Sequence, residues 1–340
     1  MKKIKPIIKY EKNYGIEILR VIITFSVVLD RFYNRKKKNF FSYILYYNIP
    51  TIFLLSFYHS YDMFATFNIT KIKLRFSKLF FPYIWWSFIA FARNNIYFYI
   101  FKRKCFHTLY FFFHHLLNGH ILIPSFWFQN ILTLTTLLIS IIVFLFKNNY
   151  ILILQIFYIL SYQIQYSGQN YSFFKKNSTF HYRLTYGRFV ETFPNAISGF
   201  LIAASKFTTK LKMYKFKTII LSIMVLIFIS KYHYYDILLG FKYGGIRRNI
   251  AAILIFFIFF LPLDKIKNTK IKKLLDLITS YTAGIYYIHD IVGTGFYIKF
   301  ILGNKIDTLL GSIIIYLRSY MLCIFINKYI GKTKIKNLIK

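Results

Sequence analysis

The chain has 340 residues, of which 57% are hydrophobic and 22% aromatic, and its mean hydropathy is positive. This composition excludes an ordinary water-soluble globular protein. The formal net charge of +36 comes from lysines and arginines spread between apolar segments instead of gathered in one patch, which argues against a nucleic-acid-binding protein. We therefore expect an integral membrane protein.

The apolar segments predict an all-α, polytopic bundle of about ten transmembrane helices, since a hydrocarbon core of ~30 Å needs roughly 20 apolar residues per crossing. We expect one domain over residues 1–340. The basic segment 1–15 enters the first apolar stretch without a small-residue cleavage site, which indicates an uncleaved signal anchor. The expected spans are 15–33, 42–60, 79–101, 126–146, 150–165, 192–205, 218–232, 249–263, 275–296 and 308–330.

Lysines and arginines are more frequent in the segments that would lie inside if the N-terminus is cytoplasmic. We therefore expect both termini in the cytoplasm and the protein in the plasma (inner) membrane, surrounded by lipids. Cys105 and Cys323 cannot form a disulfide framework, and neither stands in a spacing typical of metal ligands, so we expect no metal.

The first expected span carries charge at both ends of one face. Arg20 and Arg31 are eleven positions apart, which places them within ~20° around a helix and ~16 Å apart along it. A charged group inside a span is costly unless it faces the bundle interior or a watery cavity, so Arg20 predicts a polar pathway. The alternative is that either arginine extends to the membrane interface as an anchor.

Several segments, taken in order, resemble the motifs of the integral-membrane acyltransferase 3 family and together extend over most of the chain. They are YGIEILRVIITFSVVLDRF (14–32), IPTIFLLSFY (49–58), KIKLRFSKLFFPYIWW (71–86), SFWFQNIL (125–132), FPNAISGFLIA (193–203) and GIYYIHDIV (284–292). The resemblance implies an O-acyltransferase that moves an acetyl or similar acyl group from acetyl-CoA to a hydroxyl of a cell-surface or lipid-linked glycan.

Arg75 and Lys78 correspond to the family's Arg-x-x-Arg/Lys element. Their spacing places both cations on one helix face, where an arginine fork and a lysine point charge suit the phosphates of coenzyme A. The alternative is that they are ordinary basic residues of a cytoplasmic loop. Pro82 follows them, and we expect it in the first turn of the next helix.

The chain departs from the family pattern at Arg31. Eleven positions after the first-helix arginine the family has a histidine, which is taken as the general base of the reaction. A guanidinium stays charged at neutral pH and has no lone pair to accept a proton, so Arg31 cannot replace it. Either another group is the base, or the chain is a catalytically degenerate relative that binds a ligand without acyl transfer.

Three other residues are candidates for the base. Asp30 is adjacent, although it faces ~100° away from the Arg20 stripe and could simply form a surface ion pair. His120 precedes the SFWFQNIL segment, and histidine has a suitable intrinsic pKa, although loop histidines of this kind often only pack at an interface. His289 stands in the family-like Tyr-x-x-His element, where it could touch a substrate or only pair with its neighbours.

Overall fold

The computed structural model is all-helical over the residues that it describes, with no strand among them. These residues are 12–32, 47–97, 99, 112–113, 116, 127–167, 181–231, 245–262, 266, 268–294 and 308–329. The helices are α1 (Tyr14–Phe32), α3 (Asn48–Ala65), α4 (Ile69–Tyr97), α6 (Trp127–Phe146), α7 (Tyr150–Tyr166), α9 (His181–Ala204), α10 (Phe207–Leu211), α11 (Lys215–Lys231), α13 (Ile246–Phe260), α14 (Thr269–Ser280), α15 (Thr282–Thr294) and α17 (Thr308–Tyr329), with a 3₁₀ turn η2 (Lys212–Tyr214) between α10 and α11.

Among the described residues, three helical segments are long and apolar enough to cross a membrane. They are Trp127–Phe146, Phe207–Ser230 and Leu310–Tyr329. The first and third agree with the expected spans 126–146 and 308–330 to within two residues, whereas the second overlaps with 218–232 but begins eleven residues earlier. The outward side chains of Phe207–Ser230 include exposed Leu221, Met224 and Phe228. A continuous apolar surface of this kind suits lipid better than water.

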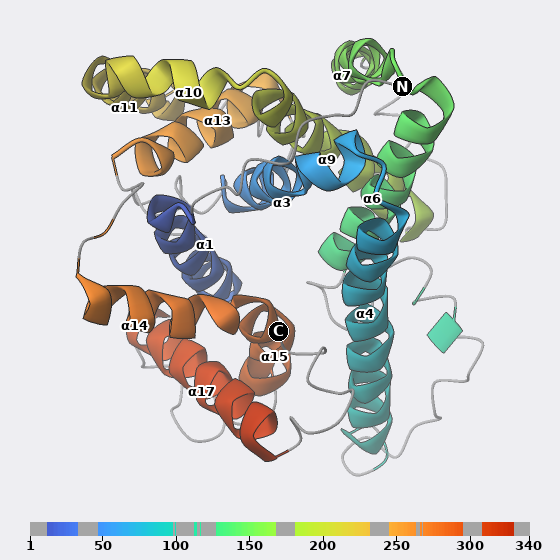
Figure 1. Ribbon diagram of the computed structural model, residues 1–340. Helices are drawn as coiled ribbons and strands as arrows, with labels where there is room; N and C mark the ends of the chain where they lie inside the picture. Colours follow the sequence, from blue (N-terminus) through green and yellow to red (C-terminus); the bar gives the residue numbers. More distant parts are fainter. Residues whose placement is uncertain are drawn as a thin grey trace.

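Two central helices, α1 and α3, connect the other elements (Figure 1). The α1 helix contacts α3, α13, α14, α15 and α17, whereas α3 packs mainly on α9 and also meets α4, α6 and α13. The principal core contains the buried rings of Phe53, Phe57, Phe128 and Phe200. A second cluster joins α1 to α13 and contains Ile16 and Leu19. The fold is therefore arranged around the interior faces of α1 and α3.

Glycines allow two of these helix pairs to approach closely. A Cβ atom at Gly199 of α9 would overlap with the backbone carbonyl of Leu54 in α3, and one at Gly15 of α1 would overlap with that of Phe259 in α13. Small residues at such crossings let two helix backbones pack directly against each other. These contacts fix the positions of α1 and α3, whose opposite faces line the cavity described below.

Two expectations about helix boundaries are wrong. The expected span 275–296 is divided at Tyr281 into α14 and α15, and α14 begins earlier, where the Asn268 side chain accepts hydrogen bonds from the backbone N–H groups of Lys270 and Ile271. Lysines along α14 make it a poor membrane span. Pro82 does not begin a helix but lies inside α4, which starts at Ile69.

The proline inside α9 is compensated by a glutamine from a neighbouring helix, and another glutamine bonds the backbone of α4 near its proline. Pro194 has no N–H to donate to the Val190 carbonyl, and Gln165 Nε2 of α7 donates a 2.7 Å hydrogen bond to that oxygen instead. In α4, Gln129 Nε2 of α6 donates a 3.0 Å hydrogen bond to the Leu79 carbonyl, beside Pro82. Neighbouring side chains thus satisfy backbone groups that a proline disturbs inside a bundle.

Candidate functional site

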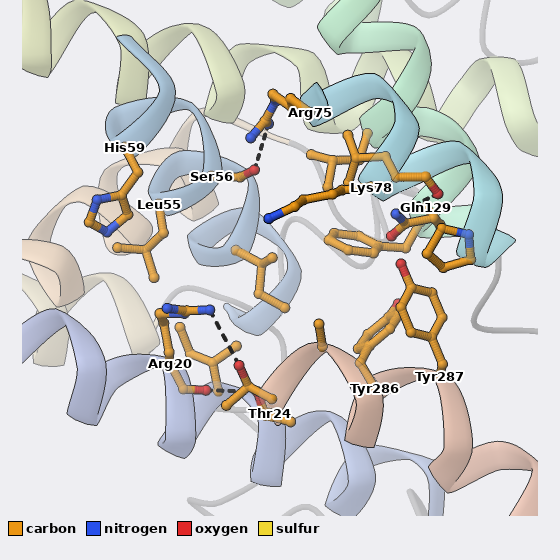
Figure 2. Close-up of a pocket in the computed structure, with 18 of the residues that line it drawn as sticks. Arg20, Thr24, Leu55, Ser56, His59, Arg75, Lys78, Gln129, Tyr286 and Tyr287 are labelled. Atoms are coloured by element: carbon orange, nitrogen blue, oxygen red, sulfur yellow. Dashed lines mark hydrogen bonds between the residues drawn. The ribbon is translucent and has the colours of Figure 1, made fainter. Parts of the chain in front are cut away.

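A cavity of about 460 Å³ lies between five helices (Figure 2). Its walls come from the first half of α1, the cavity-facing side of α3, the middle of α4, the start of α6 and the start of α15. The polar lining residues are Glu17, Arg20, Thr24, Ser56, His59, Ser60, Arg75, Lys78, Gln129, Thr282, Tyr286 and Tyr287. A volume of this size is within the usual range for a small-molecule site.

The cavity brings together three cations that the sequence presents far apart. Arg20 comes from α1, and Arg75 and Lys78 come from α4. The only carboxylate among the described lining residues is Glu17, which accepts a 3.2 Å hydrogen bond from Arg20 Nη1. The described walls therefore carry more positive than negative charge, which favours an anionic ligand.

Arg20 is oriented by its neighbours but remains accessible. Besides its ion pair with Glu17, its Nη2 lies 3.4 Å from the Thr282 hydroxyl of α15. The Arg20 side chain is 41% exposed, whereas that of Glu17 is 9% exposed. The carboxylate thus holds one edge of the guanidinium, while the other donors can reach a ligand.

Arg75 is held by hydroxyl groups from two helices. Its Nη1 donates to Ser60 at 2.6 Å and its Nη2 to Ser56 at 2.8 Å, both on α3, while its Nε donates to Thr136 of α6 at 3.2 Å. The guanidinium also lies 4.9 Å from the centre of the Phe57 ring. None of these partners is a carboxylate, so Arg75 brings an uncompensated positive charge to the described wall.

Lys78 differs from Arg75 because its ammonium group makes no hydrogen bond or ion pair with any described residue. Figure 2 shows its side chain extending from α4 across the cavity. A lysine that extends into the cavity without an anionic partner among the described residues is well placed to contact a bound anion.

His59 is a lining residue that sequence reasoning missed. It stands on α3 with Ile52, Leu55, Ser56 and Ser60, whose spacing of three and four positions defines one helix face. Polar Ser56, His59 and Ser60 on one face of an otherwise aromatic helix were the sequence signal that could have identified it. In Figure 2 the His59 ring and the Arg20 guanidinium extend toward each other from α3 and α1.

The structure places His289 next to the cavity wall but not in it. This side chain is 1% exposed, its Nδ1 lies 3.1 Å from the Ile285 carbonyl oxygen, and its ring centre is 5.8 Å from that of the lining residue Tyr286. The carbonyl can only accept, so Nδ1 holds the proton in this contact. His289 supports the wall behind Tyr286.

The other candidates for the base are only partly described. Asp30 and Arg31 belong to the last turn of α1, but their side chains fall outside the described part of the structure, as does the whole of His120. Position 31 lies about 10 Å beyond Thr24 along the α1 axis. In the described ranges no three His, Cys, Asp or Glu side chains gather in a way that could hold a metal ion.

Comparisons of the chain with protein-family models, with curated proteins and with solved structures give no match. The function of the chain is therefore inferred from its cavity and its sequence motifs.

Proposed function

We propose that the protein is a membrane O-acyltransferase that moves an acetyl or similar acyl group from acetyl-CoA to a hydroxyl of a cell-surface or lipid-linked glycan. In this proposal the chain belongs with the acyltransferase 3 family, crosses the plasma membrane about ten times and has both termini in the cytoplasm. The observation that carries the proposal is the convergence of Arg20, Arg75 and Lys78 on one cavity. These residues come from two separate motifs of the resemblance.

The charge of the cavity supports a phosphorylated donor. Arg20, Arg75 and Lys78 face a single described carboxylate, Glu17, and Arg75 has only neutral hydroxyl partners. Several cations beside one carboxylate create a positive potential that attracts an anionic ligand. The phosphates of coenzyme A provide such anions, and Lys78 is available to bind them.

The same cations suit the chemistry of transfer. Attack of an acceptor hydroxyl on a thioester places negative charge on the carbonyl oxygen, after which the carbon–sulfur bond breaks and coenzyme A leaves as the thiol. Fixed donors aimed at that oxygen lower the barrier, because they require no reorganisation during the reaction. Arg20 has an orientation fixed by Glu17 and can serve as such a donor.

The alternative is a catalytically degenerate relative that binds a ligand without transferring an acyl group. The observation in its favour is Arg31, which stands where the family has its histidine. Both proposals predict binding of coenzyme A, so only a transfer assay separates them.

The experiment compares wild-type protein with Arg31→His in lipid nanodiscs. Each is incubated with isotope-labelled acetyl-CoA and glycans from cells that lack the gene, and release of free thiol and labelled O-acetyl glycan are measured. Transfer by the wild type supports the enzyme. Transfer only by Arg31→His supports the degenerate relative. Absence of coenzyme A binding to both proteins overturns the donor assignment.

Mass spectrometry of cell-surface glycans provides the matching cellular test. The enzyme predicts an O-acetyl group that disappears on deletion of the gene and returns with the wild-type copy. An unchanged glycan profile would contradict the proposed acceptor class.

A further inference from the structure

We infer that His59 is the proton acceptor of this cavity and performs the role that Arg31 cannot. This inference rests on the proposed acyl transfer and adds to it the location of the reaction, which is between α1, α3 and α4.

The position of His59 supports this role. It lies on α3 between Ser56 and Ser60, the two serines that hold Arg75, so the imidazole and the Arg75 guanidinium lie along the same face of α3. Across the cavity, Arg20 extends from α1 toward the His59 ring (Figure 2). An acceptor hydroxyl beside His59 would therefore lie close to donors suited to the developing oxyanion.

The chemistry of the other lining groups leaves few alternatives. Arginine and protonated lysine cannot accept a proton, and serine, threonine and tyrosine hydroxyls are weak bases at neutral pH. Glu17 is occupied by its ion pair with Arg20. The ring nitrogens of His59 make no hydrogen bond with any described residue, so a lone pair is available to a substrate.

The surrounding charge couples this base to donor binding. Arg20 and Arg75 act electrostatically on His59 and oppose a further positive charge on the imidazole, whereas Glu17 favours it. An anionic donor bound by the same cations offsets that repulsion, so His59 accepts a proton more readily once coenzyme A phosphates are present.

The transfer step then balances. His59 takes the proton of the acceptor hydroxyl as its oxygen forms a bond to the acyl carbon. The carbon–sulfur bond breaks, and the imidazolium returns the proton to the sulfur of coenzyme A. The products are an O-acyl ester and free thiol, with no oxidant or reductant.

The test uses the full-length protein in nanodiscs with His59→Gln and His59→Ala. We expect both variants to bind coenzyme A with affinity close to that of the wild type and to transfer acyl groups about 100-fold more slowly or worse, in line with loss of a general base. Added imidazole should restore part of the activity of His59→Ala, where the removed ring leaves space, and not that of His59→Gln.

The outcomes distinguish the role of His59 from the proposed acyl transfer. Wild-type transfer together with near wild-type transfer by His59→Gln overturns the role of His59 and leaves the acyltransferase intact. Lack of transfer by the wild type overturns both. A parallel loss of coenzyme A binding and transfer, without rescue by imidazole, assigns His59 to ligand binding and overturns its role as the base.

A second measurement covers the case in which neither variant folds. Wild-type protein is treated with diethyl pyrocarbonate, and modification is mapped by mass spectrometry. Loss of transfer that follows modification of His59, with bound coenzyme A slowing both, supports the inference. Full activity with His59 modified overturns it.

Discussion

Lys78 lies three residues after Arg75 on α4, and both side chains line the same cavity, yet only Arg75 is anchored to the protein by described hydrogen bonds. Ser56, Ser60 and Thr136 hold the arginine, whereas the lysine extends into the space. The sequence predicts that both residues bind the ligand, whereas the structure gives them different roles. Arg75 connects α4 to α3 and α6 by hydrogen bonds and contributes positive charge to the cavity. Lys78 is the residue that can bind a ligand directly.

Replacing Lys78 should weaken ligand binding without affecting the fold. We expect Lys78→Gln to raise the dissociation constant for coenzyme A about 10-fold, which corresponds to ~1.4 kcal/mol, because one charged contact is lost. The control is Lys73→Gln on the same helix, since Lys73 is exposed and does not line the cavity. Isothermal titration calorimetry in nanodiscs measures both. Equal affinities for the two variants would show that Lys78 does not bind the donor.

Replacing Arg75 should instead affect stability. Arg75→Lys keeps the positive charge but loses the planar fork that reaches three hydroxyls on two helices. We expect the free energy of unfolding to fall by about 1–3 kcal/mol, seen as a lower unfolding temperature in detergent. Unfolding at the wild-type temperature would mean that these hydrogen bonds do not hold α4 against its neighbours.

Part of the site could be predicted from the sequence because charge inside an apolar segment is conspicuous. Arg20 was found for that reason, and the spacing of Arg75 and Lys78 placed them on one helix face, as the structure has them. His59 was missed because a single histidine in an aromatic helix is usually a packing residue. The position of His59 in one cavity with Arg20 and Arg75 follows only from the packing of α1, α3 and α4.

The helix boundaries, like the site, could be predicted only in part from the sequence. The long apolar run of α6 (Trp127–Phe146) agrees with the expected span 126–146 to within one residue. The segment 275–296 was not predicted correctly, since apolar residues at helical spacing do not tell a membrane span from the lysine-bearing, surface-lying α14. The helix start expected at Pro82 is wrong because α4 begins at Ile69, in a lysine- and arginine-bearing stretch that is not apolar enough to indicate a membrane span.

The hydrogen bond from Gln165 to the Val190 carbonyl predicts an energetic coupling to Pro194. In wild-type protein, Gln165→Leu removes this bond and also the 2.8 Å bond that Gln165 Oε1 accepts from the Gly245 N–H. We expect a loss of about 2 kcal/mol in the free energy of unfolding, because buried backbone groups are left without partners.

In a Pro194→Ala background the same substitution should cost less, since the new N–H can bond the Val190 carbonyl within α9. A double-mutant cycle on unfolding free energies measures the difference, which should be about 0.5–1.5 kcal/mol. Strictly additive effects would contradict the view that Gln165 compensates for the proline.

Replacing Gly199 or Gly187 of α9 by alanine should change the free energy of unfolding in opposite directions. A Cβ atom at Gly199 would overlap with the Leu54 carbonyl of α3, whereas one at Gly187 would have no atom within 4 Å. We expect Gly199→Ala to lower the free energy of unfolding by about 1–3 kcal/mol, because α3 and α9 must move apart. Gly187→Ala should raise it by up to ~1 kcal/mol, since alanine favours the helix.

Thermal unfolding of the two variants in the same detergent measures this contrast. Because α3 carries Ser56, His59 and Ser60, Gly199→Ala should also weaken coenzyme A binding, while Gly187→Ala should leave it unchanged. If both alanines stabilise the protein, α3 and α9 do not approach as closely as the structure has them. If Gly199→Ala lowers the unfolding temperature but leaves coenzyme A binding unchanged, the cavity does not depend on the packing of α3 against α9.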